Sequence, residues 1–256
     1  MKPQLKSAGT GHAASFWPDI LAFFIGLGSA WWLSWNTDDL VWSLWLSSLV
    51  TGYLTVFVVM GAGGYFLYVM VTHPDFERHK RASFIAGAIL VACVFLAFFS
   101  FHFGLFHLVH ASLLAHFFPL NDDVQAALPR VTISPKALVA LAWNLLPLYG
   151  FFLIASILSD RRRLFLDACT FIGNVRQAVS EPVEVEEAHI EDVPLFKDAL
   201  IGPYRNVIRM HLLIFVFAVV HYVNSHSFWI FTLVYAVYFF PWHVFLKADR
   251  DQIKRG

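Results

Sequence analysis

Long apolar stretches alternate with short polar connections along the whole chain. A helix needs about 20 apolar residues to cross a bilayer, because lipid offers the backbone no other hydrogen-bond partner. Six stretches approach this requirement: residues 16–35, 40–70, 83–103, 137–158, 207–223 and 227–246. They do not show the alternating pattern of about ten residues that is typical of a membrane β-barrel. The sequence therefore predicts a single all-α transmembrane domain, residues 1–256, with about six membrane-spanning helices.

Two of these stretches are too long for one upright crossing. Residues 40–70 contain the sequence GAGG at 61–64, where the permissive backbone of glycine could interrupt the helix. Residues 83–103 continue into the equally apolar residues 104–120. We therefore expect an extra helical stretch near 104–120 that is interfacial, re-entrant or part of a long tilted helix.

Composition also favours a membrane protein. Of the 256 residues, 58% are hydrophobic and only 14% are charged, whereas about a quarter of the residues of a soluble domain are charged. The 18 Lys and Arg balance the 18 Asp and Glu, so the net charge does not indicate a nucleic-acid partner. The lipid bilayer is the expected surrounding, with a membrane-protein partner or a homo-oligomer as further candidates.

The connections differ strongly in basic charge. If the six helices cross in turn, all of the 18 Lys and Arg except Arg130 and Lys136 fall on one side. Because basic residues are retained on the cytoplasmic side, we expect a multi-pass protein of a bacterial inner membrane with both termini in the cytoplasm. Five tryptophans would then lie at the outer surface as lipid anchors: Trp31, Trp32, Trp35, Trp42 and Trp45.

Residues 159–205 form the only sizeable polar segment of the sequence. The apolar spacing within FLDACTFIGNVRQAV (165–179) predicts an amphipathic helix on the cytoplasmic membrane surface. The acidic residues of 181–192 predict a solvated loop. The chain has no Gly-rich phosphate loop, so ATP-driven transport is not indicated.

Four histidines lie within residues 100–120: His102, His107, His110 and His116. Ionisable side chains inside a membrane are costly and usually face the bundle interior. At 100° per residue, His110 and His107 lie about 80° and 140° around a helix from His102, so these three can share one broad face. His107 and His110 are three residues apart and could hold one ion.

A metal ion or haem b is the cofactor that such histidines would bind, because neutral imidazole is a common metal ligand. His221 or His226 would lie at the same depth and could add ligands, and His102 with His221 would suffice for haem b. One alternative is a non-enzymatic scaffold or accessory subunit with structural histidines. A small-solute transporter is a further alternative, although no internal repeat supports it. The pattern assigns no catalytic residue.

Several short motifs occur together: His102-Phe103-Gly104-Leu105-Phe106 before His110, PYRNVIRMH at 203–211, and LWLSSLVTGYL at 44–54. In combination they resemble the DUF6498 family of uncharacterised multi-pass membrane proteins. This resemblance singles out His102, His110 and His211 and implies no activity. His211 would begin a helix near the cytoplasm. A joint site with His102 would therefore require a deeper or tilted third helix; otherwise there are two histidine sites.

Overall fold

The computed structural model describes residues 17–120, 134–180 and 228–240, together with the single residues Ile208, Leu212 and Val216. Within these ranges the regular structure is entirely helical, which confirms the all-α prediction. Three helices are long and apolar enough to cross a membrane: Thr37–Thr72, Arg78–Phe117 and Pro135–Ser159. The predicted count of six is not confirmed, and the predicted span at 207–223 lies outside the described ranges except for the three single residues.

The first two helices join through a tight turn. Helix α1 (Trp17–Trp32) is followed by Ser34, whose φ of 55° lets the chain reverse direction. Asn36 then caps helix α2 (Thr37–Thr72): its side chain accepts from the backbone N–H groups of Asp38 and Asp39. The Asp39 carboxylate accepts in return from the Asn36 N–H at 2.9 Å. This capping box fixes the residue at which α2 begins.

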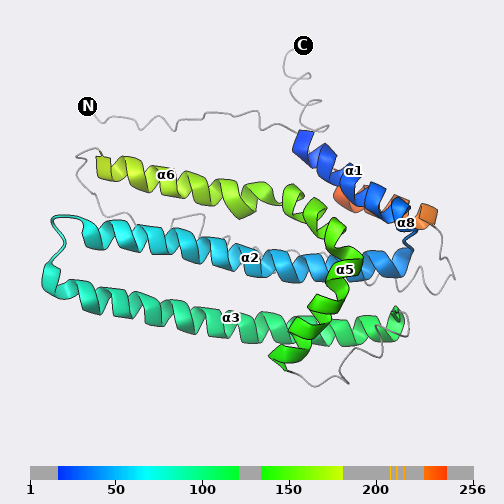
Figure 1. Ribbon diagram of the computed structural model, residues 1–256, viewed down its shortest axis with the longest axis horizontal. Helices are drawn as coiled ribbons and strands as arrows, with labels where there is room; N and C mark the ends of the chain where they lie inside the picture. The colour runs from blue at the N-terminus through cyan, green and yellow to red at the C-terminus, as the bar shows by residue number, and fades with distance from the viewer. Residues whose placement is uncertain are drawn as a thin grey trace, which may run out of the picture.

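Helices α2 and α3 (Arg81–Phe117) form a long antiparallel hairpin (Figure 1). The expected interruption at residues 61–64 is wrong, because α2 is continuous through them. Of the three alternatives for residues 104–120, a separate interfacial or re-entrant helix is wrong and a single long helix is what the structure has, because residues 104–117 continue α3 without a break. A mid-helix glycine costs about 1 kcal/mol, which is less than the cost of a backbone group without a partner in lipid. With 36 and 37 residues, the helices are each about 54 Å long.

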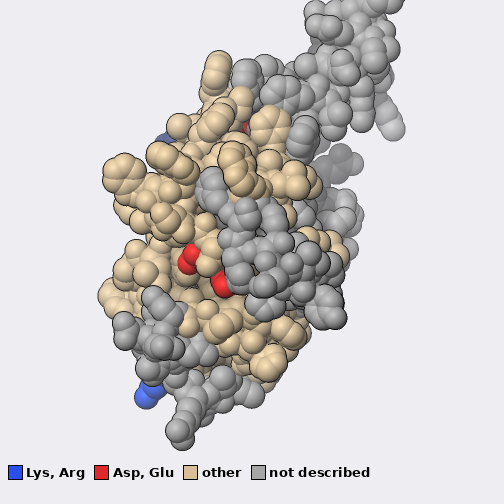
Figure 2. Space-filling view, turned by 90° about the vertical axis from the view of Figure 1, so that its right-hand side faces the viewer, with Lys and Arg blue, Asp and Glu red and all other residues tan. Residues whose placement is uncertain are grey.

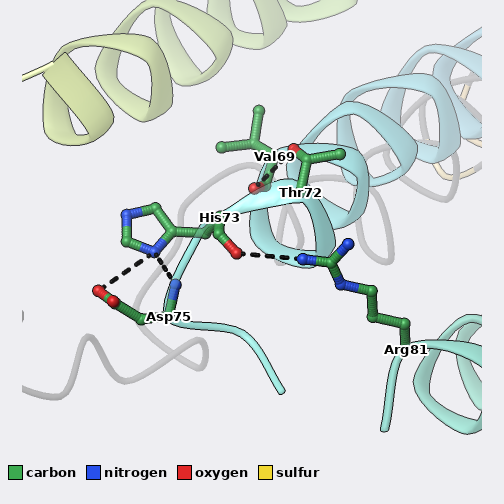
Figure 3. A network of polar contacts seen from close by, with 5 residues as sticks. All are labelled: Val69, Thr72, His73, Asp75 and Arg81. Atoms are coloured by element: carbon green, nitrogen blue, oxygen red, sulfur yellow. Dashed lines mark hydrogen bonds and ion pairs between the residues drawn. The ribbon is translucent and has the colours of Figure 1, made fainter. Parts of the chain in front are cut away.

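A polar network closes the turn end of this hairpin (Figure 3). The Nδ1 atom of His73 lies 3.4 Å from the Asp75 backbone nitrogen and 3.5 Å from the Asp75 carboxylate. Arg81, at the start of α3, donates to the His73 carbonyl at 3.4 Å. A short 3-10 helix, η1 (Arg78–Lys80), lies between them. These contacts stabilise the turn between α2 and α3. They are exposed and lie outside the hydrophobic core.

Helix α5 (Pro135–Ser159) crosses α2 and α3 instead of running beside them (Figure 1). A π-helical turn, η2 (Arg162–Leu166), leads into α6 (Asp167–Ser180), which lies along α2. Residues 167–180 of the segment predicted as an amphipathic helix are helical, and its position on the cytoplasmic membrane surface stays a prediction. Its apolar residues Ala168, Phe171 and Ile172 pack against Val59 and Ala62 of α2.

The last described helix, α8 (Phe228–Phe239), packs against α1. The Tyr235 ring stacks on Phe23 with centroids 5.2 Å apart, and its hydroxyl donates to the Phe23 carbonyl at 3.4 Å. Gly26 makes this approach possible, because a Cβ there would lie 2.1 Å from the Tyr235 hydroxyl oxygen. The four helices α1, α2, α5 and α8 thus meet at the end of the hairpin where α2 begins and α3 ends, which we call the open end.

The main hydrophobic core lies at this open end. Its largest fully buried side chains include Trp42, Trp45, Phe103, Phe118 and Phe152. Towards the turn end, by contrast, α3 exposes most of its apolar side chains, among them Leu90, Val91 and Val94. Figure 2 looks onto the open end, where the described surface is almost entirely uncharged. A surface of this kind is stable in lipid and unstable in water.

Candidate functional site

The structure divides the four histidines of α3 into two pairs. His107 and His110 are buried, with 0% and 3% of their surfaces exposed, whereas His102 and His116 are exposed. The buried pair shares a helix face with Phe103 and Leu114, which recur at the three- and four-residue spacing of a packed helix side. The expected broad face containing His102 is therefore not the one that α3 buries.

His107 is fixed by its own helix and by α2. Its Nδ1 lies 2.9 Å from the Phe103 carbonyl oxygen. Its ring packs on the rings of Phe103 and Trp45, with centroids 4.3 and 5.8 Å away. A carbonyl oxygen can only accept, so Nδ1 carries the proton in this contact. When the ring is neutral, Nε2 therefore holds the lone pair.

His110 repeats this arrangement one turn further along α3. Its Nδ1 lies 2.9 Å from the Phe106 carbonyl oxygen, and its ring meets the Phe106 ring edge-on with centroids 4.3 Å apart. The same tautomer follows, with the lone pair on Nε2 of the neutral ring. An Nδ1–H bonded to a carbonyl is also the arrangement that orients histidines for metal binding through Nε2.

Two tryptophans of α2 hold this part of α3 in register. The Trp45 indole N–H donates to the His107 carbonyl at 3.0 Å, and the Trp42 indole N–H donates to the Phe118 carbonyl at 2.8 Å. The prediction that Trp35, Trp42 and Trp45 are lipid anchors is wrong, because all three are buried. The sequence does indicate the burial of Trp42 and Trp45: together with Leu49 and Gly52 they recur at three- and four-residue spacing, which places them on one face of a helix.

A carboxylate and a phenol connect α2 to α5 near the same end. The Tyr149 hydroxyl donates to Asp39 Oδ1 at 3.0 Å, while the other Asp39 oxygen serves the capping box. The Trp35 ring meets Tyr149 edge-on, with centroids 5.2 Å apart. Each carboxylate oxygen of Asp39 thus accepts a hydrogen bond from another protein group. Sequence reasoning did not find this pair, since 110 positions separate its members.

Buried hydroxyl groups line α2 beside these contacts. Ser43, Thr51 and Thr55 each donate to a carbonyl of their own helix at 2.7–2.8 Å. Ser47 and Ser48 are equally buried, at 3% and 5% exposure. Within the part of the chain that the structure describes, neither of their hydroxyl oxygens has a hydrogen-bond partner.

The described residues supply two neighbouring imidazoles and fall short of a complete metal site. No group of three or more His, Cys, Asp or Glu that could hold a metal ion occurs among them. His211, His221 and His226, which the sequence offers as further ligands, lie outside the described ranges. The rings of His107 and His110 are buried, and each packs against the ring of a neighbouring phenylalanine of α3.

An open groove of about 510 Å³ lies elsewhere, on the exposed side of α5. Residues of the first turns of α5 line it: Pro135, Lys136, Val139, Ala140, Trp143 and Asn144. None of the candidate histidines lines it. The groove is therefore separate from the histidine pair.

Comparison with known proteins gives one family. A family model described as a family of unknown function, DUF6498, matches residues 9–162, which is more than half of the chain. The matched region contains α1, α2, α3 and α5, and with them His102, His107 and His110. No curated protein and no solved structure matches the chain.

Proposed function

Because this chain belongs to DUF6498, a family of unknown function, we propose a function from its own residues: a membrane protein that binds a transition-metal ion at His107 and His110. The observation that carries the proposal is the anchoring of both buried rings through Nδ1 to backbone carbonyls, each at 2.9 Å. Buried ionisable groups in a membrane protein are expensive and tend to serve function. His107 and His110 lie on adjacent turns of one helix face, so a ligand that both rings share would account for the burial of both.

Further ligands have to come from other helices. His102 is exposed, on a different side of α3 from the buried pair, so it is the weakest of the candidate ligands. His221 is the strongest, since the proposed topology, with both termini in the cytoplasm, puts it at the outer end of the sequence stretch 207–223. His211 begins that stretch about 15 Å deeper, and a site there would be a second one.

The kind of ion follows from the ligands and the surroundings. Imidazole nitrogens suit zinc, copper, iron and nickel. Both oxygens of Asp39 already hold protein groups, so this carboxylate is not available to balance the charge. A singly charged copper ion costs less to bury than a doubly charged one, and copper(I) is therefore the first candidate, followed by zinc.

Metal analysis of the purified protein tests this proposal. Protein extracted in detergent without chelators should contain a stoichiometric amount of copper or zinc by mass spectrometry. Its absorption spectrum should lack the Soret band of haem. If the wild-type protein carries no stoichiometric metal, including after incubation with copper(I) or zinc, the proposal fails.

A second candidate function, a non-catalytic scaffold or accessory subunit, rests on a different observation. Both buried imidazoles already bond to their own helix and pack against aromatic rings, as structural histidines do. In addition, α3 exposes a long apolar surface near the turn end that includes Leu90 and Val94. A stable membrane-protein partner or a homo-oligomer in mild detergent, together with the absence of bound metal, would favour this function.

A further inference from the structure

A row of hydroxyl groups on the buried side of α2 carries an inference that is independent of the metal. Ser43, Ser47, Thr51 and Thr55 recur every four residues, and Ser48 lies beside them. All five are at most 5% exposed. A hydroxyl inside a helix normally points to solvent or donates to the carbonyl four residues earlier. Buried hydroxyls without any partner are destabilising and rare.

Ser47 and Ser48 depart from this rule, whereas Thr51 and Thr55 follow it. The Thr51 and Thr55 hydroxyls donate to the carbonyls of Ser47 and Thr51, both at 2.7 Å. Ser47 and Ser48 have carbonyls at the same spacing, those of Ser43 and Leu44, but their hydroxyls make no such bond within the described structure. The two hydroxyls are therefore buried polar groups whose hydrogen bonds the described protein atoms do not supply.

The packing of α2 on α3 indicates which helix Ser48 faces. Trp45 bonds to the His107 carbonyl, and a Cβ at Gly52 would lie 2.3 Å from the Phe103 ring. Ser48 is three residues after Trp45 and four before Gly52, so it lies on the same face of α2. Since the helices are antiparallel, Ser48 faces α3 between Phe103 and His107.

We propose that the buried Ser48 hydroxyl binds ordered water between α2 and α3, next to His107, and that Ser47, about 100° further around α2, binds a separate water. A water molecule needs two to four polar partners, and each hydroxyl together with the adjacent backbone carbonyls can supply them. The ligand has to be small, because the two serines are 97% and 95% buried. It has to be neutral, because the hydroxyls bring no charge to offset that of an ion. Such water hydrates a buried imidazole whether or not a metal is bound.

The sign of a mutational effect tests this proposal. If the Ser48 hydroxyl holds water, Ser48→Ala loses a hydrogen bond and lowers the unfolding temperature by about 2–4 °C. If the hydroxyl has no ligand, the same change removes an unsatisfied group and raises that temperature. Ser47→Ala should behave like Ser48→Ala. Ser43→Ala is the matched control, because it removes a hydroxyl of the same helix that is bonded to the Leu40 carbonyl at 2.8 Å.

A high-resolution density map of the wild-type protein provides the second measurement, which does not depend on how the variants fold. We expect density for water within hydrogen-bond distance of Ser48 Oγ. An unfolding temperature that rises or stays unchanged in Ser48→Ala, or a map without this density, overturns the proposal. Neither result affects the metal analysis, so the two proposals fail separately.

Discussion

At the scale of single residues, the indole N–H groups of Trp42 and Trp45 on α2 form hydrogen bonds to the carbonyls of Phe118 and His107 at the end of α3. A helical carbonyl keeps a second lone pair after accepting its own helix bond, and the Trp45 indole N–H uses the one on His107. The same bond ties the histidine backbone to α2 without involving the imidazole. Interhelical hydrogen bonds of this kind contribute on average about 0.6 kcal/mol in membrane proteins, and at most about 1.7 kcal/mol.

Trp45→Phe should therefore destabilise the protein. Phenylalanine keeps an aromatic ring but cannot donate to the His107 carbonyl, and it leaves space in a fully buried position. We expect the unfolding temperature in detergent to fall by about 2–4 °C for each kcal/mol lost. The control is Trp32→Phe, since Trp32 is 80% exposed and should change little. Equal effects of the two substitutions would contradict the cross-helix role of Trp45.

The histidine pair was only partly predictable from the sequence. The spacing of His107 and His110 with Phe103 and Leu114 indicates a packed face, and the burial of both residues follows from it. The sequence could not separate this face from the one with His102, because α3 is apolar on every side. Which side of such a helix is buried depends on its partners, and the residues of α2 that pack on this face are distant in sequence, as Trp45 is 62 positions from His107.

At the scale of helices, α2 shows how glycine can serve opposite purposes in one element. Gly52 lets the Phe103 ring approach to a distance that a side chain would block. At Gly61 and Gly64, by contrast, an added Cβ would meet no atom within 4 Å in the described structure. The helix continues through both kinds of site.

This contrast predicts opposite effects of the same substitution. Gly61→Ala and Gly64→Ala should each stabilise α2 by about 0.5–1 kcal/mol, because alanine restricts the unfolded chain more than glycine does. Gly52→Ala should destabilise the protein, because the new Cβ would lie 2.3 Å from the buried Phe103 ring. Thermal unfolding of the three variants measures both effects. A loss of stability at Gly61 or Gly64 would instead indicate that a second copy or a partner packs there.

Helix α5 is held at its end by an ion pair. Arg161 donates to Asp19 of α1, and the side chains are 18% and 14% exposed. Removing one member of a partly buried pair leaves the other charge without compensation. Asp19→Asn should therefore lower the unfolding temperature more than the double variant Asp19→Asn with Arg161→Gln does. If the double variant is the less stable of the two, the pair is not coupled in this way.

At the scale of the whole molecule, the hairpin of α2 and α3 exceeds the thickness of a bilayer. Each helix is about 54 Å long, whereas the hydrocarbon core is about 30 Å thick. The helices must tilt or extend beyond the core, and α5 crosses them at the open end (Figure 1). Hydropathy predicted the three helices that are long and apolar enough to cross a membrane. It could not predict this crossing, because side-chain packing between helices sets their angles.

The proposed topology predicts which loops are accessible from outside the cell. With Cys93 and Cys169 replaced by serine, a single cysteine at Gln125 should react with a membrane-impermeant thiol reagent applied to intact spheroplasts. A single cysteine at His79, in the turn between α2 and α3, should react only after the membrane is disrupted. The reverse pattern would place both termini outside the cytoplasm.

The central claim is that the buried histidines His107 and His110 hold a metal ion. The most direct test is the metal content of two matched double variants. One variant is His107→Ala with His110→Ala, and the other is His102→Ala with His116→Ala, so each loses two imidazoles from α3. Both are purified as folded, monodisperse protein and analysed beside the wild type. We predict that the first variant loses the bound metal and the second retains it. Metal retained by the first variant, or lost equally from both, would contradict the assignment.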